Sequence, residues 1–197
     1  MILNYYQESD NINTAIIGLH GWTGTEHSMV PVAKSMKISN AKWYIPRAPY
    51  NASSGKGYTW FSGSPENGWK TEKTFNLMDK LFNKIIDDGF SYNKIILLGF
   101  SMGASLSLRY GLRLDFSLKG IIPIAGYMRD TDELINTSSI KSKQTPILIN
   151  ALEKHKAEFG CVAVMEVKTG KIKAIANLRR IEEGLFIEDY KIGRAHV

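Results

Sequence analysis

Apolar residues along the first 150 positions fall into short continuous runs and longer runs with helical spacing. The continuous runs are typical of strands buried on both faces of a sheet: residues 14–19, 42–45, 94–99, 120–125 and 146–150. The helically spaced runs predict amphipathic helices over 26–36, 69–88, 102–112 and, more briefly, 130–136. Strands that alternate with helices predict an α/β fold with a mostly parallel sheet covered on both faces. Pro123 is unusual for a central strand because it has no N–H to donate.

The chain changes character near Asn150. All four tryptophans precede this residue, and charged residues are denser after it. Two β-like runs at 161–167 and 172–176 flank a turn, which predicts a hairpin instead of a further helix and strand. We therefore predict a truncated α/β domain over residues 1–150 and a tail of different origin over 151–197, with a hairpin at about 161–176.

Composition places the chain among ordinary globular proteins, with 44% hydrophobic and 22% charged residues. No apolar run approaches the roughly 20 residues that cross a bilayer, and the polar N-terminus does not resemble a secretory signal. The single cysteine excludes an internal disulfide framework and a cysteine-rich metal site. The net charge of +6 is dispersed, which argues against a nucleic-acid partner. We expect a cytoplasmic protein without a metal, and the oligomeric state stays open.

The strongest chemical signal surrounds Ser101. Residues 99–103 read Gly-Phe-Ser-Met-Gly, between a predicted strand and a predicted helix. In that context the pattern G-x-S-x-G predicts a sharp turn that presents the serine hydroxyl as a nucleophile. Gly99 and Gly103 suit a turn so tight that side chains there would collide. The alternative is a serine that only caps the helix N-terminus.

A glycine-rich turn follows the first predicted strand, where residues 19–24 read Leu-His-Gly-Trp-Thr-Gly. Serine hydrolases of this strand–turn–helix type take one oxyanion donor from such a turn. We predict that the backbone N–H groups of Trp22 and Met102 form the oxyanion hole, with Gly21 beside them. The alternative is an ordinary glycine-rich turn.

Several stretches resemble the phospholipase/carboxylesterase family of α/β hydrolases, which includes acyl-protein thioesterases. They are residues 19–24, 46–49, 57–61, 99–104 and 145–149. The resemblance implies hydrolysis of a small acyl ester, lysophospholipid or acyl thioester through an acyl-enzyme on Ser101, without a cofactor. It also implies that Trp60 and Phe61 lie near an acyl pocket, although a packing role is an equal alternative.

The chain departs from the resembling family after the last predicted strand. In this fold the acid and then the histidine follow the serine along the chain, and the family carries the acid directly after this strand. Here residues 150–155 read Asn-Ala-Leu-Glu-Lys-His. His155, with Glu153 or Glu158 as its partner, is a candidate base, but a solvated helix histidine is the alternative.

The other histidines are weaker candidates for the base. His20 lies in the glycine-rich turn, where the resemblance implies a structural role, His27 lies at a helix start, and His196 lies in the terminus. We expect an incomplete catalytic triad and an inactive chain.

The tail has resemblances of its own. Residues 159–190 resemble part of the transpeptidase domain of penicillin-binding proteins, upstream of an S-x-x-K motif that does not occur here. Residues 192–197 resemble a translated sequencing adapter. Our hypothesis is a truncated esterase joined near Asn150 to a foreign fragment. The alternatives are a non-catalytic α/β binding module and a penicillin-binding transpeptidase fragment.

Overall fold

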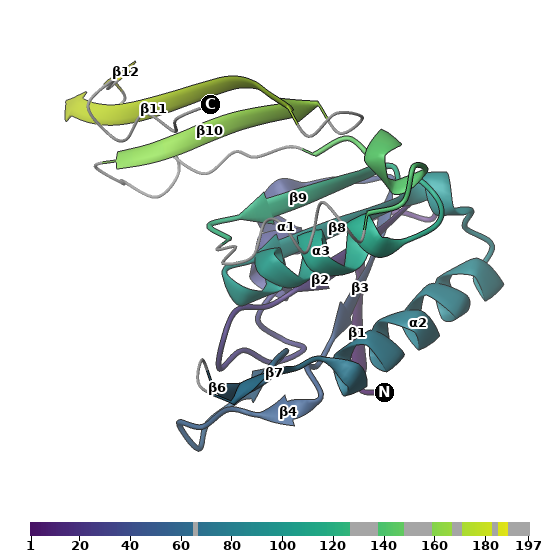
Figure 1. Cartoon of the computed structure of the whole chain (residues 1–197). Coiled ribbons are helices and arrows are strands. Elements are labelled where there is room, and N and C mark those ends of the chain that lie inside the picture. Colours follow the sequence, from purple (N-terminus) through teal and green to yellow (C-terminus); the bar gives the residue numbers. More distant parts are fainter. Residues whose placement is uncertain (65–66, 127–137, 148–158, 167–170, 183–184, 189–197) are drawn as a thin grey trace.

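The computed structural model contains a five-stranded sheet in the order β1-β3-β2-β8-β9 (Figure 1). The structure describes residues 1–64, 67–126, 138–147, 159–166, 171–182 and 185–188. Its sheet strands are β1 Leu3–Gln7, β2 Thr14–Leu19, β3 Ala41–Pro46, β8 Ile95–Phe100 and β9 Gly120–Ile124. The helices in the described residues are α1 Val30–Met36, α2 Glu72–Asp87 and α3 Met102–Arg113, with short 3-10 turns at Tyr92–Lys94 and Ser142–Gln144.

Parallel pairing dominates the sheet. Strand β2 pairs in parallel with both β3 and β8, and β8 pairs in parallel with β9. All six residues of β2 are buried, as a central strand requires. Only β1 runs antiparallel among these five strands, at the edge beside β3. The prediction of an α/β fold with a mostly parallel sheet is confirmed.

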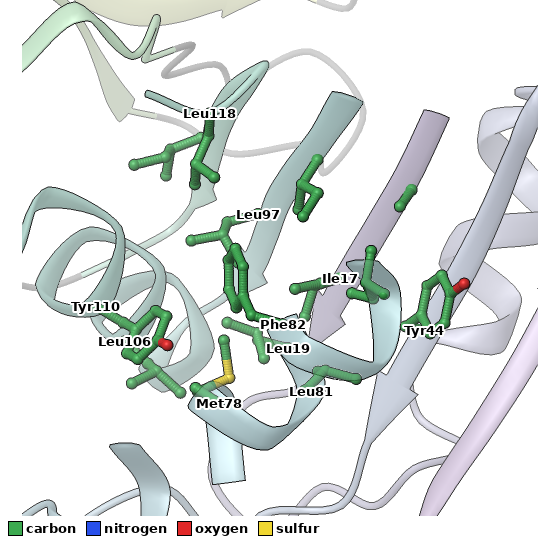
Figure 2. Packing of buried hydrophobic residues seen from close by; sticks show 14 of the residues in the cluster. Ile17, Leu19, Tyr44, Met78, Leu81, Phe82, Leu97, Leu106, Tyr110 and Leu118 are labelled. Carbon is green, nitrogen blue, oxygen red and sulfur yellow. The ribbon is translucent and has the colours of Figure 1, made fainter. Parts of the chain in front are cut away.

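The sheet buries side chains on both faces, because successive residues of a strand point to opposite sides. On β2, Ile17 belongs to the cluster that packs against α2 and α3, whereas Ile16 belongs to the cluster that packs against α1. Figure 2 shows the first cluster, in which Met78 and Phe82 of α2 lie over Leu97 and Ile17 of the sheet. This double burial explains why the strands read as continuous apolar runs.

The helix boundaries differ from the sequence prediction at their N-terminal ends. Helix α1 begins at Val30 and not near Glu26, after a series of turns. Helix α2 begins at Glu72, since residues before it form strand β7. Gly89 adopts a φ of 95° just past α2, the left-handed conformation expected of a helix-terminating glycine.

The sequence analysis missed β1 and two short hairpins between β3 and α2. The hairpins pair β4 Tyr50–Asn51 with β5 Tyr58–Thr59, and β6 Ser62–Ser64 with β7 Gly68–Lys70. Their strands are two or three residues long, too short to show a hydrophobic period. They lie at the end of the molecule where β2 and β3 finish, so they bear on the candidate site (Figure 1).

Pro123 fits within β9 because of the direction in which its nitrogen points. Ile121 donates its N–H to Pro146, away from β8, and Ile124 offers its carbonyl to the opposite side, toward Ser101. Residues two apart in a strand point the same way, so the Pro123 nitrogen also faces away from β8. The proline therefore removes no hydrogen bond between β8 and β9.

The later part of the chain is described in pieces. Ile147 forms a parallel bridge with Ile121, in agreement with a strand beginning near residue 146. The rest of that strand and the helix predicted over 130–136 lie outside the described residues. A separate antiparallel sheet contains β10 Phe159–Glu166, β11 Lys171–Glu182 and β12 Leu185–Glu188. Strands β10 and β11 pair where a hairpin is predicted, and the turn between them lies outside the described residues. In the described residues, no helix is long and apolar enough to span a membrane.

Candidate active site

Ser101 occupies a strained turn between β8 and α3. Its φ of 53° and ψ of −116° lie in a region that residues other than glycine rarely adopt. Its N–H donates to the Ile124 carbonyl of β9 at 2.9 Å, and its own carbonyl accepts from Ala104 at 2.9 Å. These backbone bonds on both sides hold the serine in a conformation it would not take alone.

Two glycines allow this turn to form. A Cβ atom at Gly99 would lie 2.2 Å from the Gly103 carbonyl oxygen, and one at Gly103 would lie 2.2 Å from the Leu19 carbonyl oxygen. Both distances are far below van der Waals contact, so only glycine fits at either position. The start of α3 consequently packs directly on the end of β2.

The Ser101 hydroxyl is not used to cap the helix. Ser101 stands at the N-cap position of α3, but its side chain makes no capping hydrogen bond. A serine kept only as a cap would direct its oxygen to an amide of the first turn. The arrangement therefore favours the nucleophile over the capping alternative.

The turn over residues 20–26, called the 20–26 turn below, lies beside Ser101. A Cβ atom at Gly21 would be 3.4 Å from the Ser101 Cβ and 3.3 Å from the Phe100 ring. The Gly24 N–H donates to the Gly21 carbonyl at 3.0 Å and closes a tight turn. Trp22 is the second residue of this turn, and its own N–H takes no part in that hydrogen bond. The Met102 amide is at the start of α3, where helix N–H groups have no intrahelical acceptor. Of the two predicted donors, Met102 follows Ser101 in the chain, and Trp22 follows Gly21, which lies beside Ser101.

His20 is fully buried and holds the turn in place. Its Nδ1 lies 2.7 Å from the Gly21 carbonyl oxygen, and the Ala48 N–H donates to its Nε2 at 3.2 Å. A carbonyl only accepts and an amide N–H only donates, so Nδ1 carries the proton and the ring is neutral. Burial lowers the pKa of His20, in agreement with a neutral ring.

The second described histidine has partners other than Ser101. His27 is exposed, with its Nδ1 3.2 Å from Asn4 and its Nε2 3.2 Å from Glu26. Among the residues that the structure describes, neither His20 nor His27 bonds to Ser101. The candidates His155, Glu153, Glu158 and His196 all lie outside the described residues.

Trp60 and Phe61 occupy different environments. Trp60 is fully buried, and its Nε1 donates to the His20 carbonyl at 2.7 Å. Its own carbonyl accepts a hydrogen bond from Thr74 of α2. Trp60 is therefore packed in the core, as the packing alternative expects. Phe61 is half-buried, with the Arg109 guanidinium 5.9 Å from its ring.

Sequence reasoning missed an ion pair at the end of the turn. Glu26 is 5% exposed, and Arg47 donates to its two carboxylate oxygens at 2.6 and 2.5 Å. The same guanidinium donates to the Tyr58 hydroxyl at 3.1 Å. The hydrogen bond from Arg47 lowers the pKa of Glu26 from 4.5 to about 2. Arg47 lies within the stretch 46–49 and Glu26 lies just after the stretch 19–24, but their spacing in the sequence does not predict that they form an ion pair.

Thr59 is a second residue that the sequence analysis missed. Thr59 is buried, and its hydroxyl oxygen lies 3.1 Å from the Met102 sulfur. Thr59 thus links β5 to Met102, the residue that follows Ser101. In the described part of the chain, no cluster of histidine, cysteine or acidic residues is arranged to hold a metal ion.

Comparison with known families shows which family these residues belong to. The model of the phospholipase/carboxylesterase family matches residues 5–156. The chain belongs to this family. The match includes the 20–26 turn, the β8–α3 turn and the strand that begins near residue 146.

The similar proteins are esterases and thioesterases by name. An acyl-protein thioesterase 1 from Cryptococcus neoformans is 27% identical over 149 residues, 67% of this chain and 62% of the relative. The carboxylesterase SOBER1 from Arabidopsis thaliana is 27% identical over 150 residues, 68% of this chain and 66% of the relative. The chain thus spans less than two thirds of these curated relatives.

Solved structures of the family share the fold. The crystal structure of SOBER1 matches with a TM-score of 0.60 at 24% identity, over 70% of this chain and 73% of that one. Esterase PE8 matches with a TM-score of 0.66 at 22% identity, over 75% and 73%. These likenesses show the α/β-hydrolase fold.

The contact between Gly103 and β2 gives a testable prediction on stability. Gly103→Ala places a Cβ against the Leu19 and His20 carbonyl oxygens, backbone atoms that cannot rotate away. We expect the free energy of unfolding in urea to fall by about 3 kcal/mol. Gly120→Ala is the control, because its Cβ meets its nearest atom at 3.5 Å. Equal losses in the two variants would contradict the prediction.

The ion pair at Glu26 gives a prediction on pH dependence. The Glu26 pKa is about 2 in the folded chain and about 4.5 when unfolded, so its contribution to stability is complete above pH 4.5 and is lost as the pH falls toward 2. Glu26→Gln should therefore be less stable than the parent at pH 7, and the gap should narrow below pH 4.5. Asp88, whose pKa is also about 2, titrates in both proteins and cancels in the difference. A gap independent of pH, measured by urea unfolding from pH 7 to 3, would refute this account.

Proposed function

We propose that residues 1–150 derive from a serine hydrolase that cleaves small acyl esters or acyl thioesters. Ser101 is the nucleophile, and the N–H groups of Trp22 and Met102 bind the oxyanion. The observation that carries the proposal is the strained backbone of Ser101 beside the 20–26 turn. Backbone hydrogen bonds to Ile124 of β9 and from Ala104 of α3 hold it there.

In the proposed reaction, the Ser101 oxygen attacks the acyl carbonyl carbon while a base removes the hydroxyl proton. The carbonyl oxygen becomes an oxyanion between the two amides, each of which is typically worth about 3 kcal/mol of the barrier. The carbon–oxygen or carbon–sulfur bond to the leaving group then breaks, and the leaving alcohol or thiol takes the proton. Water hydrolyses the acyl-enzyme by the same steps.

Neither histidine among the described residues is placed to act as the base. His20 is neutral with both ring nitrogens bonded, and His27 is bonded to Asn4 and Glu26. We propose that the triad of the 197-residue chain is incomplete, because residues 150–155 replace the family's acid-bearing pattern and His155 stands at about the position of the acid. His155 is the alternative base.

The strain at Ser101 supports an enzyme over a non-catalytic binding module. Residues held in rare backbone conformations cost about 1–3 kcal/mol, and such strain clusters at sites of chemistry. A binding module would have no need for a serine in this conformation, because glycine adopts it without strain. The substrate classes follow the printed names of the relatives, which are a carboxylesterase and acyl-protein thioesterases.

A fluorophosphonate probe tests the proposal. We expect weak or absent labelling of the purified chain, and Ser101-dependent labelling when imidazole is added as an external base. The matched control is Ser101→Ala, measured by mass spectrometry with and without imidazole. Labelling that survives in Ser101→Ala, or none with imidazole in a folded chain, would refute the nucleophile. Strong labelling without imidazole would show that the chain supplies its own base.

We also propose that the residues after about 150 come from another protein. The family match ends at residue 156, and the antiparallel β10–β11 pair differs from the parallel sheet before it. The transpeptidase and adapter resemblances of residues 159–190 and 192–197 lie beyond the match and stay hypotheses. Resequencing the gene across codons 145–155 should find a junction. An unbroken natural reading frame in independent reads would contradict a chimera.

A further inference from the structure

The 20–26 turn needs support from outside itself. Thr23 adopts a φ of 65°, a left-handed conformation that is costly for a β-branched residue. Trp22 is 50% exposed, so its side chain does not anchor the turn in the core. A turn with these features keeps one geometry only when its neighbours fix it.

Both ends of the turn are held by two consecutive residues that follow β3. The Ala48 N–H donates to Nε2 of His20 at the start of the turn, and the Arg47 guanidinium binds the Glu26 carboxylate at its end. The parallel register of β2 and β3, with Ile17 opposite Tyr44, sets where these two residues stand. These two supports therefore stand directly after a paired strand of the sheet.

Arg47 also reaches the middle of the turn through Tyr58. Its guanidinium donates to the Tyr58 hydroxyl and lies 4.6 Å from the ring centroid. The Tyr58 N–H donates to the Gly24 carbonyl at 3.0 Å, and the neighbouring Gly57 packs directly on the Thr23 carbonyl. One arginine thus connects the end and the middle of the turn.

Only arginine has the donors for this arrangement. Nε and Nη2 bind the two oxygens of Glu26, while Nη1 binds Tyr58. A lysine ammonium is a point charge without a planar fork, so it would keep the charge but not this geometry. Without Arg47, the nearly buried Glu26 carboxylate would keep only the exposed His27 ring, 3.2 Å away, as a charged neighbour, and burial of a poorly paired carboxylate is costly.

We propose that Arg47 and Glu26 are positioning residues that fix the 20–26 turn, so that the Trp22 amide stays directed at the oxyanion formed on Ser101. The role of that amide rests on the proposed function. The fixed geometry of the turn does not.

The first test measures the turn itself by amide hydrogen exchange. The Gly24 and Tyr58 amides are the reporters, since both bonds belong to the turn. Arg47→Met should raise their exchange rates by about tenfold or more while the amides of β8 stay protected. Arg47→Lys should give a smaller rise and serves if the methionine variant fails to fold.

Lys42→Met is the matched control for this test. Lys42 lies on β3, the strand that Arg47 follows, pairs with Asp88 at 3.1 Å and has the same 27% side-chain exposure as Arg47. We expect this variant to leave the exchange of Gly24 and Tyr58 unchanged. Equal exchange at these amides in the Arg47 and Lys42 variants would overturn the proposal.

The second test measures acylation of Ser101 by the fluorophosphonate probe with imidazole present. We expect the second-order rate constant of Arg47→Met to fall about tenfold relative to Lys42→Met, because one oxyanion donor is misplaced. Equal rates would overturn the positioning role. If the parent chain itself is not acylated, the proposed function fails, and the exchange measurement alone decides whether Arg47 fixes the turn.

Discussion

The site depends on a contact between two backbones, where the start of α3 packs on the last carbonyl groups of β2. No side chain fits there, since a Cβ atom at Gly103 would lie 2.2 Å from the Leu19 oxygen. The contact places the residue after β8 and the turn after β2 at one point in space. Because β2 and β8 are paired in register, with Leu19 opposite Gly99, the whole arrangement belongs to the rigid centre of the sheet.

Backbone strain is concentrated at the same edge of the sheet. Four residues other than glycine have positive φ in the described part of the chain. Three of them follow parallel strands: Thr23 follows β2, Ser101 follows β8 and Ala125 follows β9. The fourth, Lys37, ends α1, where a left-handed residue is common. The carboxyl ends of parallel strands are where α/β folds bind ligands, so the strain and the expected substrate position coincide.

The sequence is sufficient to predict those parts of this site that depend on local order along the chain. The β8–α3 turn is predictable because strand, glycines, serine and helix are contiguous, and burial on both faces makes the strands legible as apolar runs. The pairing of Glu26 with Arg47 is not predictable, because it joins residues 21 positions apart through a tertiary contact. Trp60 is undecided in the sequence for the same reason, since its burial depends on contacts with His20 and Thr74.

The described residues include the proposed nucleophile and oxyanion donors, and neither of the two histidines among them bonds to Ser101. Ser101 and the two proposed amide donors are contributed by β2, β8, α3 and their turns, and the supports come from residues 47–60. His20 belongs to this assembly as a support, because releasing its Nε2 to accept a proton would break the bond to Ala48 and free the start of the turn. His20 therefore cannot serve as the base without disturbing the turn that carries the proposed oxyanion donor, Trp22. The proposed nucleophile and the proposed donors thus lie on one set of packed elements that does not include the candidate base His155, and an external base can report whether Ser101 reacts.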